Sequence, residues 1–237
     1  VDRFVVQTPS MAAALRKLRG VGKKPIAVLP FVDPCTLPEP RPPETEKTSN
    51  PDYDFVYVSD GAAHKNHRAL FAAWKILAEN GSFPTLALTL HPQRDYALRQ
   101  ELARLINETQ VRIVDLGQMD HEQALELYKR VGALIFASFA ETFGIPLIEA
   151  AKAGVPIVAA EKDFVRDVCI PSETFDPDSP RSIARAVRRY LGNPEPPIEM
   201  LAPRDFLTMI HEERPNADIV TGVSSGELAR GGLAAGA

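Results

Sequence analysis

Residues 133–149 read Ala133-Leu-Ile-Phe-Ala-Ser-Phe-Ala-Glu-Thr-Phe-Gly-Ile-Pro-Leu-Ile-Glu149 and carry the clearest structural pattern of the chain. They begin with a short apolar run, 133–136, of the kind found in a strand buried within a sheet. A loop follows, and a predicted helix starts at Ile145 with Pro146 in its first turn, where the missing N–H of proline is tolerated. A strand that runs through a short loop into a helix is the repeating unit of α/β folds.

The alternation of strand and helix continues on both sides of this segment. Further strands are predicted at 55–58, 85–90, 111–114 and 155–159, and further helices at 66–79, 94–106, from Asp120 to Tyr128, and from Ser179 to Leu191. Asp120 with Gln123 has the spacing of a capping box, and Ser179-Pro180 is typical of a helix start. Short connections favour right-handed βαβ units. We therefore predict an α/β fold with a doubly wound, Rossmann-like parallel sheet.

The chain is predicted to contain four segments. They are a remnant of a preceding domain at 1–31, a proline-rich linker at 32–53, the sheet domain at 54–210 and a disordered tail at 211–237. The linker holds six prolines, which fix φ and remove backbone donors. The tail is rich in Gly, Ala and Ser and poor in apolar residues. Because the sequence begins with Val1 and enters a strand at once, we expect a fragment of a longer protein.

Composition excludes several classes of protein. The formal net charge is -4, which argues against general nucleic-acid binding. No run of 18 apolar residues is present, so no membrane-spanning helix is predicted. Cys35 and Cys169 form no CxxC pair, which fits reduced thiols in a cytoplasmic protein. Peripheral contact with a membrane is left open.

The loop before Ile145 is predicted to bind an anion. Ligands of parallel sheets sit at the carboxyl ends of the strands, where this loop lies. The free N–H groups and the positive end of the helix dipole form an anion site, and Gly144 allows close approach of the backbone. Glu141 lies before the helix and Glu149 about one turn inside it, so the two carboxylates flank the anion. The alternative is a helix-start charge at Glu141 and a surface residue at Glu149.

The string Glu141-Thr-Phe-Gly-Ile-Pro-Leu-Ile-Glu-Ala150, followed by Ala153-Gly-Val-Pro-Ile-Val158, resembles the signature of retaining group 1 glycosyltransferases of the GT-B fold. Other segments resemble this family in the same order: Val56 to Asn66, Leu116-Gly117, Leu127-Tyr128, Ile135 to Ser138, and Phe175 to Pro177. The resemblance covers residues 54–192, which would form the C-terminal, donor-binding domain. Residues 5–8 and 28–30 resemble the end of the acceptor domain and the entry to the linker.

The resemblance implies a role for each matching residue. Glu141 would contact the hydroxyls of the donor sugar, Glu149 the ribose hydroxyls, and Lys65 the pyrophosphate leaving group. The amides of Phe143 and Gly144 would hold phosphate and sugar. The further substrate-binding candidates are Asn66, His91, Ser138, Thr142 and Ile145. No metal and no other cofactor is implied, because Lys65 and the helix dipole supply the positive charge.

The implied partners are a nucleotide diphosphate sugar, linked to UDP, GDP or ADP, and a hydroxyl acceptor such as a saccharide or a lipid-linked glycan. Retention is expected through front-face departure, in which the leaving phosphate takes the acceptor proton. The chain by itself is expected to bind nucleotide weakly and to transfer nothing. Two rivals are a GT-B sugar-nucleotide epimerase and a non-enzymatic doubly wound module such as a receiver domain, in which Asp115 would be the phospho-acceptor.

Some residues depart from the family pattern. Ser59-Asp60 stand where an arginine or a glycine-rich turn is usual, and Asp60 would repel phosphate unless it turns away. His64 and Arg68 are candidates for the missing charge. His91 either lines the nucleotide pocket or caps the strand end. Asp176-Pro-Asp178 matches a metal motif of another glycosyltransferase fold, but its position before a helix start favours a turn and cap. Asp52-Tyr-Asp54 is likewise not taken as a metal site.

Overall fold

The structure is a computed structural model that describes residues 2–33, 36–38, 50–198 and 200–212 of the 237-residue chain. The chain divides into two compact units, Val1–Pro194 and Glu195–Ala237. Most of the predicted linker and nearly all of the predicted disordered tail lie outside the described residues. In the second unit, α8 spans Pro203–Glu212, so its last two residues lie within the predicted disordered tail.

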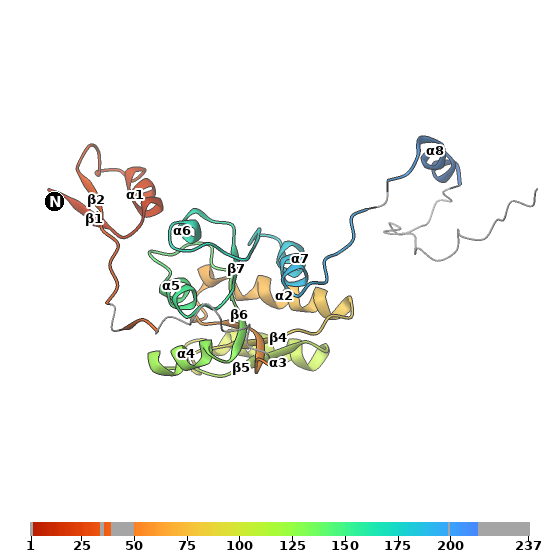
Figure 1. The fold of residues 1–237 in the computed structure, drawn as a ribbon, viewed down its shortest axis with the longest axis horizontal. Helices are drawn as coiled ribbons and strands as arrows, with labels where there is room; N and C mark the ends of the chain where they lie inside the picture. The colour runs from red at the N-terminus through yellow and green to blue at the C-terminus, as the bar shows by residue number, and fades with distance from the viewer. Residues whose placement is uncertain (1, 34–35, 39–49, 199, 213–237) are drawn as a thin grey trace, which may run out of the picture. The chain divides into compact units, whose positions relative to one another are not determined.

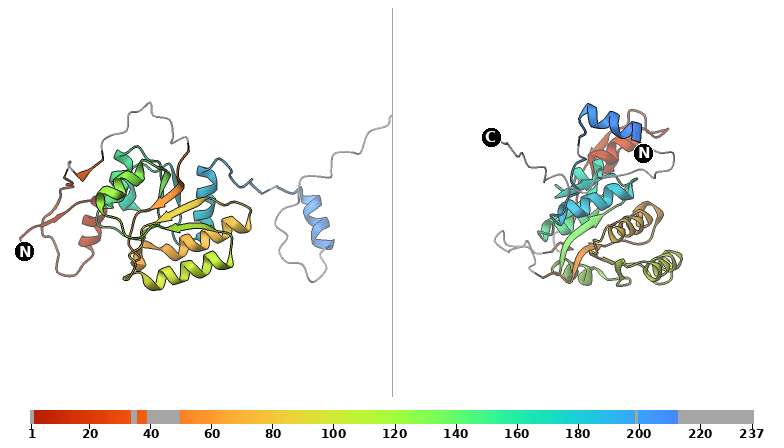
Figure 2. Two further views of the ribbon diagram at one scale, coloured as in Figure 1. Left: turned by 90° about the horizontal axis from the view of Figure 1, so that it is seen from below. Right: turned by 90° about the vertical axis from the view of Figure 1, so that its right-hand side faces the viewer.

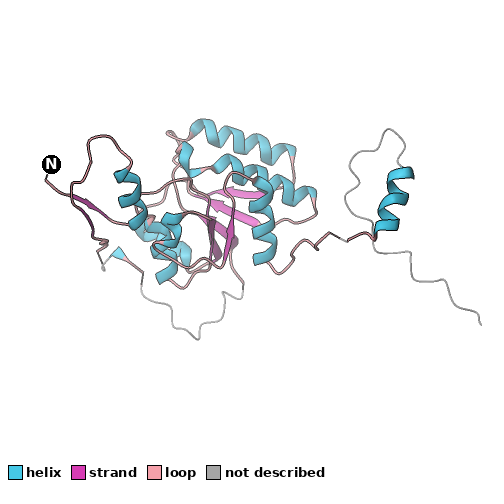
Figure 3. Ribbon diagram, turned by 90° about the horizontal axis from the view of Figure 1, so that it is seen from above, coloured by secondary structure: helices cyan, strands magenta, loops and turns pink. Residues whose placement is uncertain are grey.

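Six parallel strands form the main sheet of the first unit (Figure 1, Figure 3). They are β3 (Tyr53–Tyr57), β4 (Thr85–Leu88), β5 (Arg112–Asp115), β6 (Val131–Phe136), β7 (Ile157–Ala160) and β8 (Glu173–Phe175). The order across the sheet is β5-β4-β3-β6-β7-β8, and every neighbouring pair is parallel. The predicted doubly wound sheet is therefore confirmed. The order reverses between β3 and β6, which makes their carboxyl ends the topological switch point.

Helices cover both faces of this sheet. They are α2 (His67–Glu79), α3 (Tyr96–Glu108), α4 (His121–Tyr128), α5 (Ile145–Lys152), α6 (Asp163–Arg166) and α7 (Pro180–Tyr190). Figure 2 shows α2 and α3 on one side of the sheet and α4 and α5 on the other. α7 returns to pack beside α2. Because the sheet is buried on both faces, its strands are continuously apolar. A sheet with one exposed face would show alternating apolar and polar residues.

The core is centred on β3. Phe55, Val56 and Tyr57 are fully buried. The Phe55 ring meets the Trp74 ring of α2 edge-on, with centroids 5.8 Å apart, and the Tyr190 ring of α7 at 5.4 Å. β3 begins at Tyr53, the last residue of the predicted linker. The carboxylate of Asp54 accepts hydrogen bonds from the backbone N and Oγ1 of Thr85, which joins β3 to β4.

Helix starts follow the predicted capping residues. The Asp120 side chain accepts from the Gln123 backbone N at 2.8 Å, and the Gln123 side chain accepts from the Asp120 backbone N at 3.0 Å, so the predicted capping box is confirmed. At α7, Ser179 Oγ accepts from the Ser182 backbone N at 3.1 Å. These bonds satisfy backbone donors that have no acceptor within the helix.

Replacing Ser179 by Ala is expected to lower the free energy of unfolding by about 1 kcal/mol, because the cap of α7 is lost. Urea denaturation followed by circular dichroism measures this change. Ser172→Ala is the matched control, because Ser172 is exposed in a loop and caps no helix. Equal stability of the two variants would contradict the prediction.

Two short elements, β2 (Ile26–Val28) and the four-residue α6, were not predicted. β8 overlaps the family-like segment at 175–177 only at Phe175. β2 pairs in parallel with β1 (Phe4–Val6), and α1 (Pro9–Arg16) connects them. The backbone N of Ser10 donates to Asp167 Oδ2 at 2.9 Å, which links α1 to the residue that follows α6. Within the described residues, no helix has the length and apolar character needed to cross a membrane.

Candidate functional site

The loops that follow β3 and β6 form the candidate site at the switch point. The two strands are hydrogen-bonded neighbours, so their carboxyl ends lie side by side. The first loop contains η2 (Ala63–Lys65), and the second leads to α5. The carbonyl of His64 joins the two loops, because it accepts from the backbone N of Phe139 at 2.8 Å. Two segments that are far apart in the sequence are thus held together by the sheet.

Lys65, Glu141 and Ser138 meet in this site. Lys65 Nζ lies 2.5 Å from Glu141 Oε1, and Ser138 Oγ donates to the same oxygen at 2.7 Å. The Lys65 and Glu141 side chains are only 16% and 11% exposed, so their ion pair is largely shielded from water. Tyr57 OH donates to the backbone carbonyl of Lys65 at 2.8 Å. Burial raises the pKa of the Tyr57 phenol, which therefore stays a neutral donor.

Asn66 positions Lys65 at the start of α2. Among the described residues it is the one non-glycine residue with positive φ, at φ 61° and ψ 34°. Its buried side-chain Nδ2 donates to the backbone carbonyls of Pro177 at 2.8 Å and Ala137 at 3.3 Å. These two bonds stabilise a backbone conformation that asparagine tolerates better than most residues. The geometry gives Asn66 a structural role, and its contact with substrate stays a prediction.

The N-terminus of α5 lies at the same edge of the sheet. Gly144 is the N-cap residue with φ 75°, a left-handed conformation that favours glycine. Phe143 is buried, whereas Thr142 and Ile145 are exposed. The first N–H groups of a helix have no acceptor within the helix, and they carry the positive end of its dipole. The arrangement can therefore bind an anion beside the Lys65 ammonium.

Glu149 is buried, contrary to the alternative that placed it on the surface. Its side chain is 5% exposed. Oε1 lies 2.8 Å from His121 Nε2, and Oε2 accepts a hydrogen bond from Tyr128 OH at 3.2 Å. Burial and the neighbouring carboxylate raise the pKa of the Tyr128 phenol. Both partners come from α4, so Glu149 connects α4 to α5.

His121 is the site residue that sequence reasoning missed. A signal for it was present, because the predicted cap at Asp120 makes His121 the first residue of α4, at the carboxyl edge of the sheet. Tyr128 follows seven residues later, which places it on the same face of the helix two turns away. The sequence places Tyr128 in this helix and in a family-like segment, without a role in the site.

The residues that depart from the family pattern have partners within the chain. Asp60 Oδ1 accepts from the backbone N of Ala62 at 3.3 Å, and Oδ2 lies 3.7 Å from Arg94 Nη2. The guanidinium of Arg68 forms a bidentate ion pair with Glu101, at 2.8 and 2.7 Å. The Arg68 guanidinium thus lies on the outer surface of α2 and α3 in this structure, and its supply of the missing charge stays a prediction.

His91 and Asp176 each accept hydrogen bonds from backbone N–H groups of the residues that follow them. His91 Nδ1 accepts hydrogen bonds from the backbone N of Gln93 at 3.1 Å and of Arg94 at 3.0 Å, and lining of the nucleotide pocket by His91 stays a prediction. Asp176 Oδ1 accepts from the backbone N of Asp178 at 3.0 Å, so the predicted turn before α7 is confirmed.

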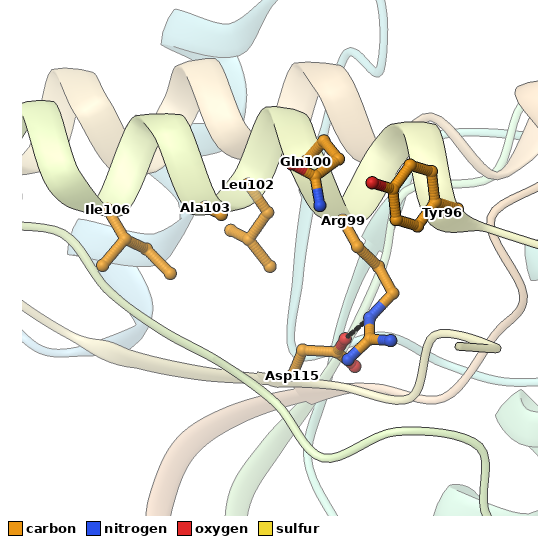
Figure 4. Close-up of a pocket in the computed structure, with 7 residues that line it drawn as sticks. All are labelled: Tyr96, Arg99, Gln100, Leu102, Ala103, Ile106 and Asp115. Atoms are coloured by element: carbon orange, nitrogen blue, oxygen red, sulfur yellow. Dashed lines mark hydrogen bonds and ion pairs between the residues drawn. The ribbon is translucent and has the colours of Figure 1, made fainter. Parts of the chain in front are cut away.

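Asp115 lies at the end of the edge strand β5, where it holds two loops together (Figure 4). It lines a cavity of about 320 Å³ between α3 and the end of β5, where its Oδ2 lies 2.5 Å from Arg99 Nε. Its Oδ1 accepts from the backbone N of Leu90 at 3.2 Å and of Gly117 at 3.0 Å. Both carboxylate oxygens of Asp115, the phospho-acceptor of the receiver alternative, thus have partners within the chain. These contacts hold the loops after β4 and β5 in place.

The fold and the site together define an α/β domain in which a helix start with free N–H groups lies between two carboxylates. Residues 41–201, more than half of the chain, match the sequence profile of the family described as glycosyl transferases group 1. The chain belongs to this family, so the predicted resemblance is confirmed.

The chain is similar to several characterised members. It is 30% identical over 138 residues to the serotype-specific mannosyltransferase WbdA of Escherichia coli, which is 58% of this chain and 17% of that protein. It is 34% identical over 82 residues to a glycogen synthase of Mycobacterium tuberculosis, which is 33% of this chain and 20% of that one. The chain thus spans about a fifth or less of the length of these relatives.

Solved structures show the same fold. The sucrose-phosphate synthase of Thermosynechococcus elongatus superimposes with a TM-score of 0.65 at 27% identity, covering 82% of this chain and 50% of that one. HepE of Anabaena, solved with UDP-glucose, has a TM-score of 0.62 at 19% identity, covering 81% and 54%. The predicted likeness to one half of a GT-B fold is confirmed.

Proposed function

We propose that this chain carries the donor site of a glycosyltransferase that transfers a sugar, with retention, from a nucleotide diphosphate sugar to a hydroxyl acceptor. The observation that carries the proposal is the cluster of Lys65, Glu141 and Ser138 beside the N-terminus of α5. The ammonium of Lys65 and the free N–H groups at the start of α5 can together bind a diphosphate. The neighbouring Glu141 carboxylate can accept hydrogen bonds from sugar hydroxyls. The similarity to a mannosyltransferase makes a mannosyl donor the first to test.

The hydrogen-bond inventory of the cluster leaves capacity for this ligand. Lysine has three N–H donors, and one of them is used on Glu141, so two can reach phosphate oxygens. Lys65 and Ser138 both use Oε1 of Glu141, which leaves Oε2 for a sugar hydroxyl. The diphosphate would then lie at Gly144, the sugar at Glu141 and the ribose at Glu149.

The proposed reaction breaks the bond between the anomeric carbon and the phosphate oxygen. The acceptor hydroxyl attacks from the same face, and its proton passes to the departing phosphate. Negative charge grows on the leaving diphosphate in the transition state, where Lys65 and the N–H groups at the start of α5 stabilise it. The acceptor would be a saccharide or a lipid-linked glycan bound by parts of the protein outside this sheet.

Thermal-shift measurement with UDP, GDP and ADP tests the donor site directly. We expect one of the three nucleotides to raise the unfolding temperature, because a ligand that binds only the folded state stabilises it by mass action. The nucleotide that does so names the donor base. No shift with any of them at millimolar concentration would overturn the proposed donor class.

Replacing Glu149 by Gln is expected to weaken binding of that nucleotide about 10- to 100-fold, because the amide loses the charge-assisted hydrogen bonds to the ribose hydroxyls. Glutamine keeps the shape of the buried side chain and an acceptor for Tyr128. Isothermal titration calorimetry measures the change, with Glu126→Gln on the exposed face of α4 as the control. Unchanged affinity in Glu149→Gln would remove the ribose assignment.

A further inference from the structure

We propose that His121 is a positioning residue of the donor site, where it orients the Glu149 carboxylate toward the ribose of the nucleotide. The inference rests on the proposed function and adds to it a residue of α4 that neither of the signature segments contains. It starts from the 2.8 Å contact between His121 Nε2 and Glu149 Oε1.

Two donors from one helix fix the plane of the carboxylate. His121 holds Oε1 and Tyr128 OH holds Oε2, so each oxygen has one partner and the group cannot rotate freely. An ionised carboxylate has about four lone-pair sites, so each oxygen can still accept one more hydrogen bond. The two neighbouring hydroxyls of a ribose supply two donors with a fixed spacing. A carboxylate with a fixed plane is pre-organised to receive both.

His121 lies on the accessible side of this pair. Its side chain is 45% exposed, whereas that of Glu149 is 5% exposed. Tyr128 is fully buried, so it holds Glu149 from the inside of the domain. The imidazole is therefore the solvent-facing partner of the Glu149 carboxylate. The histidine is a contact that a substitution can remove without opening a cavity in the core.

The capping box makes His121 rigid. Asp120 and Gln123 exchange hydrogen bonds around it, which fixes the backbone of the first turn of α4. The imidazole therefore projects from a defined point at the carboxyl edge of the sheet. A residue that orients a ligand-binding group needs this kind of support, because a loose partner would not restrict the carboxylate.

Calorimetry on the whole chain tests the inference with the nucleoside diphosphate that binds best among UDP, GDP and ADP. His121→Ala is expected to weaken binding about tenfold, since one hydrogen bond to a charged group is lost. His121→Gln, which keeps a side-chain N–H donor, is expected to restore most of the affinity. Glu122→Ala, an exposed neighbour on the same turn, should bind as the unmodified chain does.

A ligand without ribose hydroxyls separates positioning from a merely structural role. With the 2′,3′-dideoxynucleoside diphosphate, the unmodified chain should bind more weakly, and His121→Ala should cause no further loss. An equal loss with both ligands would overturn the inference, because the histidine would then not act through the hydroxyls.

The failure of this inference is distinct from a failure of the proposed function. If Glu149→Gln weakens binding and His121→Ala does not, His121 has no positioning role and the donor site stands. If the unmodified chain binds none of the three nucleotides, both proposals are overturned.

Discussion

Replacing Lys65 by Ala is expected to lower kcat for sugar transfer about 100- to 1,000-fold, the usual cost of removing one group that stabilises transition-state charge. The reason lies in the position of the ammonium, which is shielded at the switch point of the sheet and lies 2.5 Å from Glu141. In such a site, water cannot replace the missing charge as it would at the surface. The effect should fall on kcat more than on KM, because the charge on the leaving diphosphate grows during the reaction.

The measurement is the steady-state rate of sugar transfer by the enzyme that contains this chain. Lys75→Ala is the matched control, because Lys75 is an exposed lysine on the same helix, α2. Removal of Lys65 also leaves Glu141 largely buried without its cation, so the unfolding temperature must be recorded alongside the rate. Near-normal turnover in a folded Lys65→Ala variant would contradict the role given to this residue.

The sheet could be predicted from the sequence because its strands are buried on both faces. The run Ala133–Phe136 is apolar at every position, which is typical of a strand that is buried on both faces. A helix follows it after a short loop. The helix starts at Asp120 and Ser179 were predictable for a local reason, since each cap is made by residues three positions apart. Elements of three or four residues, such as β2 and α6, are too short to show a period.

The contacts within the site could not be predicted in the same way. Sequence places Lys65 and Glu141 at one edge of the sheet, but the pairing of their side chains depends on the register of β3 against β6. The same holds for His121 and Glu149, whose side chains meet although they come from different helices, α4 and α5. Arg68 follows Lys65 by three residues, yet its guanidinium pairs with Glu101 of α3 in this structure. Pairing between helices is a tertiary property that spacing along the chain does not encode.

The site is built so that its charges compensate one another before a donor arrives. Lys65 is balanced by Glu141, and Glu149 is held by two side chains of α4, His121 and Tyr128. Burial of such groups is costly unless they are paired and hydrogen-bonded. A diphosphate would add negative charge next to Lys65 and the start of α5, where donors remain. The precise placing of that helix start is therefore as important as the charged side chains.

Replacing Gly144 by Val is expected to destabilise the domain and to lower kcat/KM for transfer about 100-fold, the scale of a displacement near 1 Å in a positioned group. Gly144 has φ 75°, which costs an L-residue roughly 1–2 kcal/mol. A Cβ atom at this position would lie 3.0 Å from Leu147 Cδ1, and valine adds two methyl groups beyond it. Leu147 is fully buried and has little room to move, so we expect the first turn of α5 to shift, together with the N–H groups proposed to bind the diphosphate.

Gly81→Val separates the displacement of the helix start from backbone strain alone. Gly81 has φ 73°, but a Cβ added there meets no atom within 4 Å, and it lies at the end of α2 opposite to Lys65. We expect Gly81→Val to lower the unfolding temperature by strain while leaving kcat/KM near that of the unmodified enzyme. Steady-state kinetics and thermal unfolding of both variants provide the comparison. If Gly144→Val lost stability to the same extent as Gly81→Val and kept its activity, the N-terminus of α5 would have no role in binding the donor phosphates.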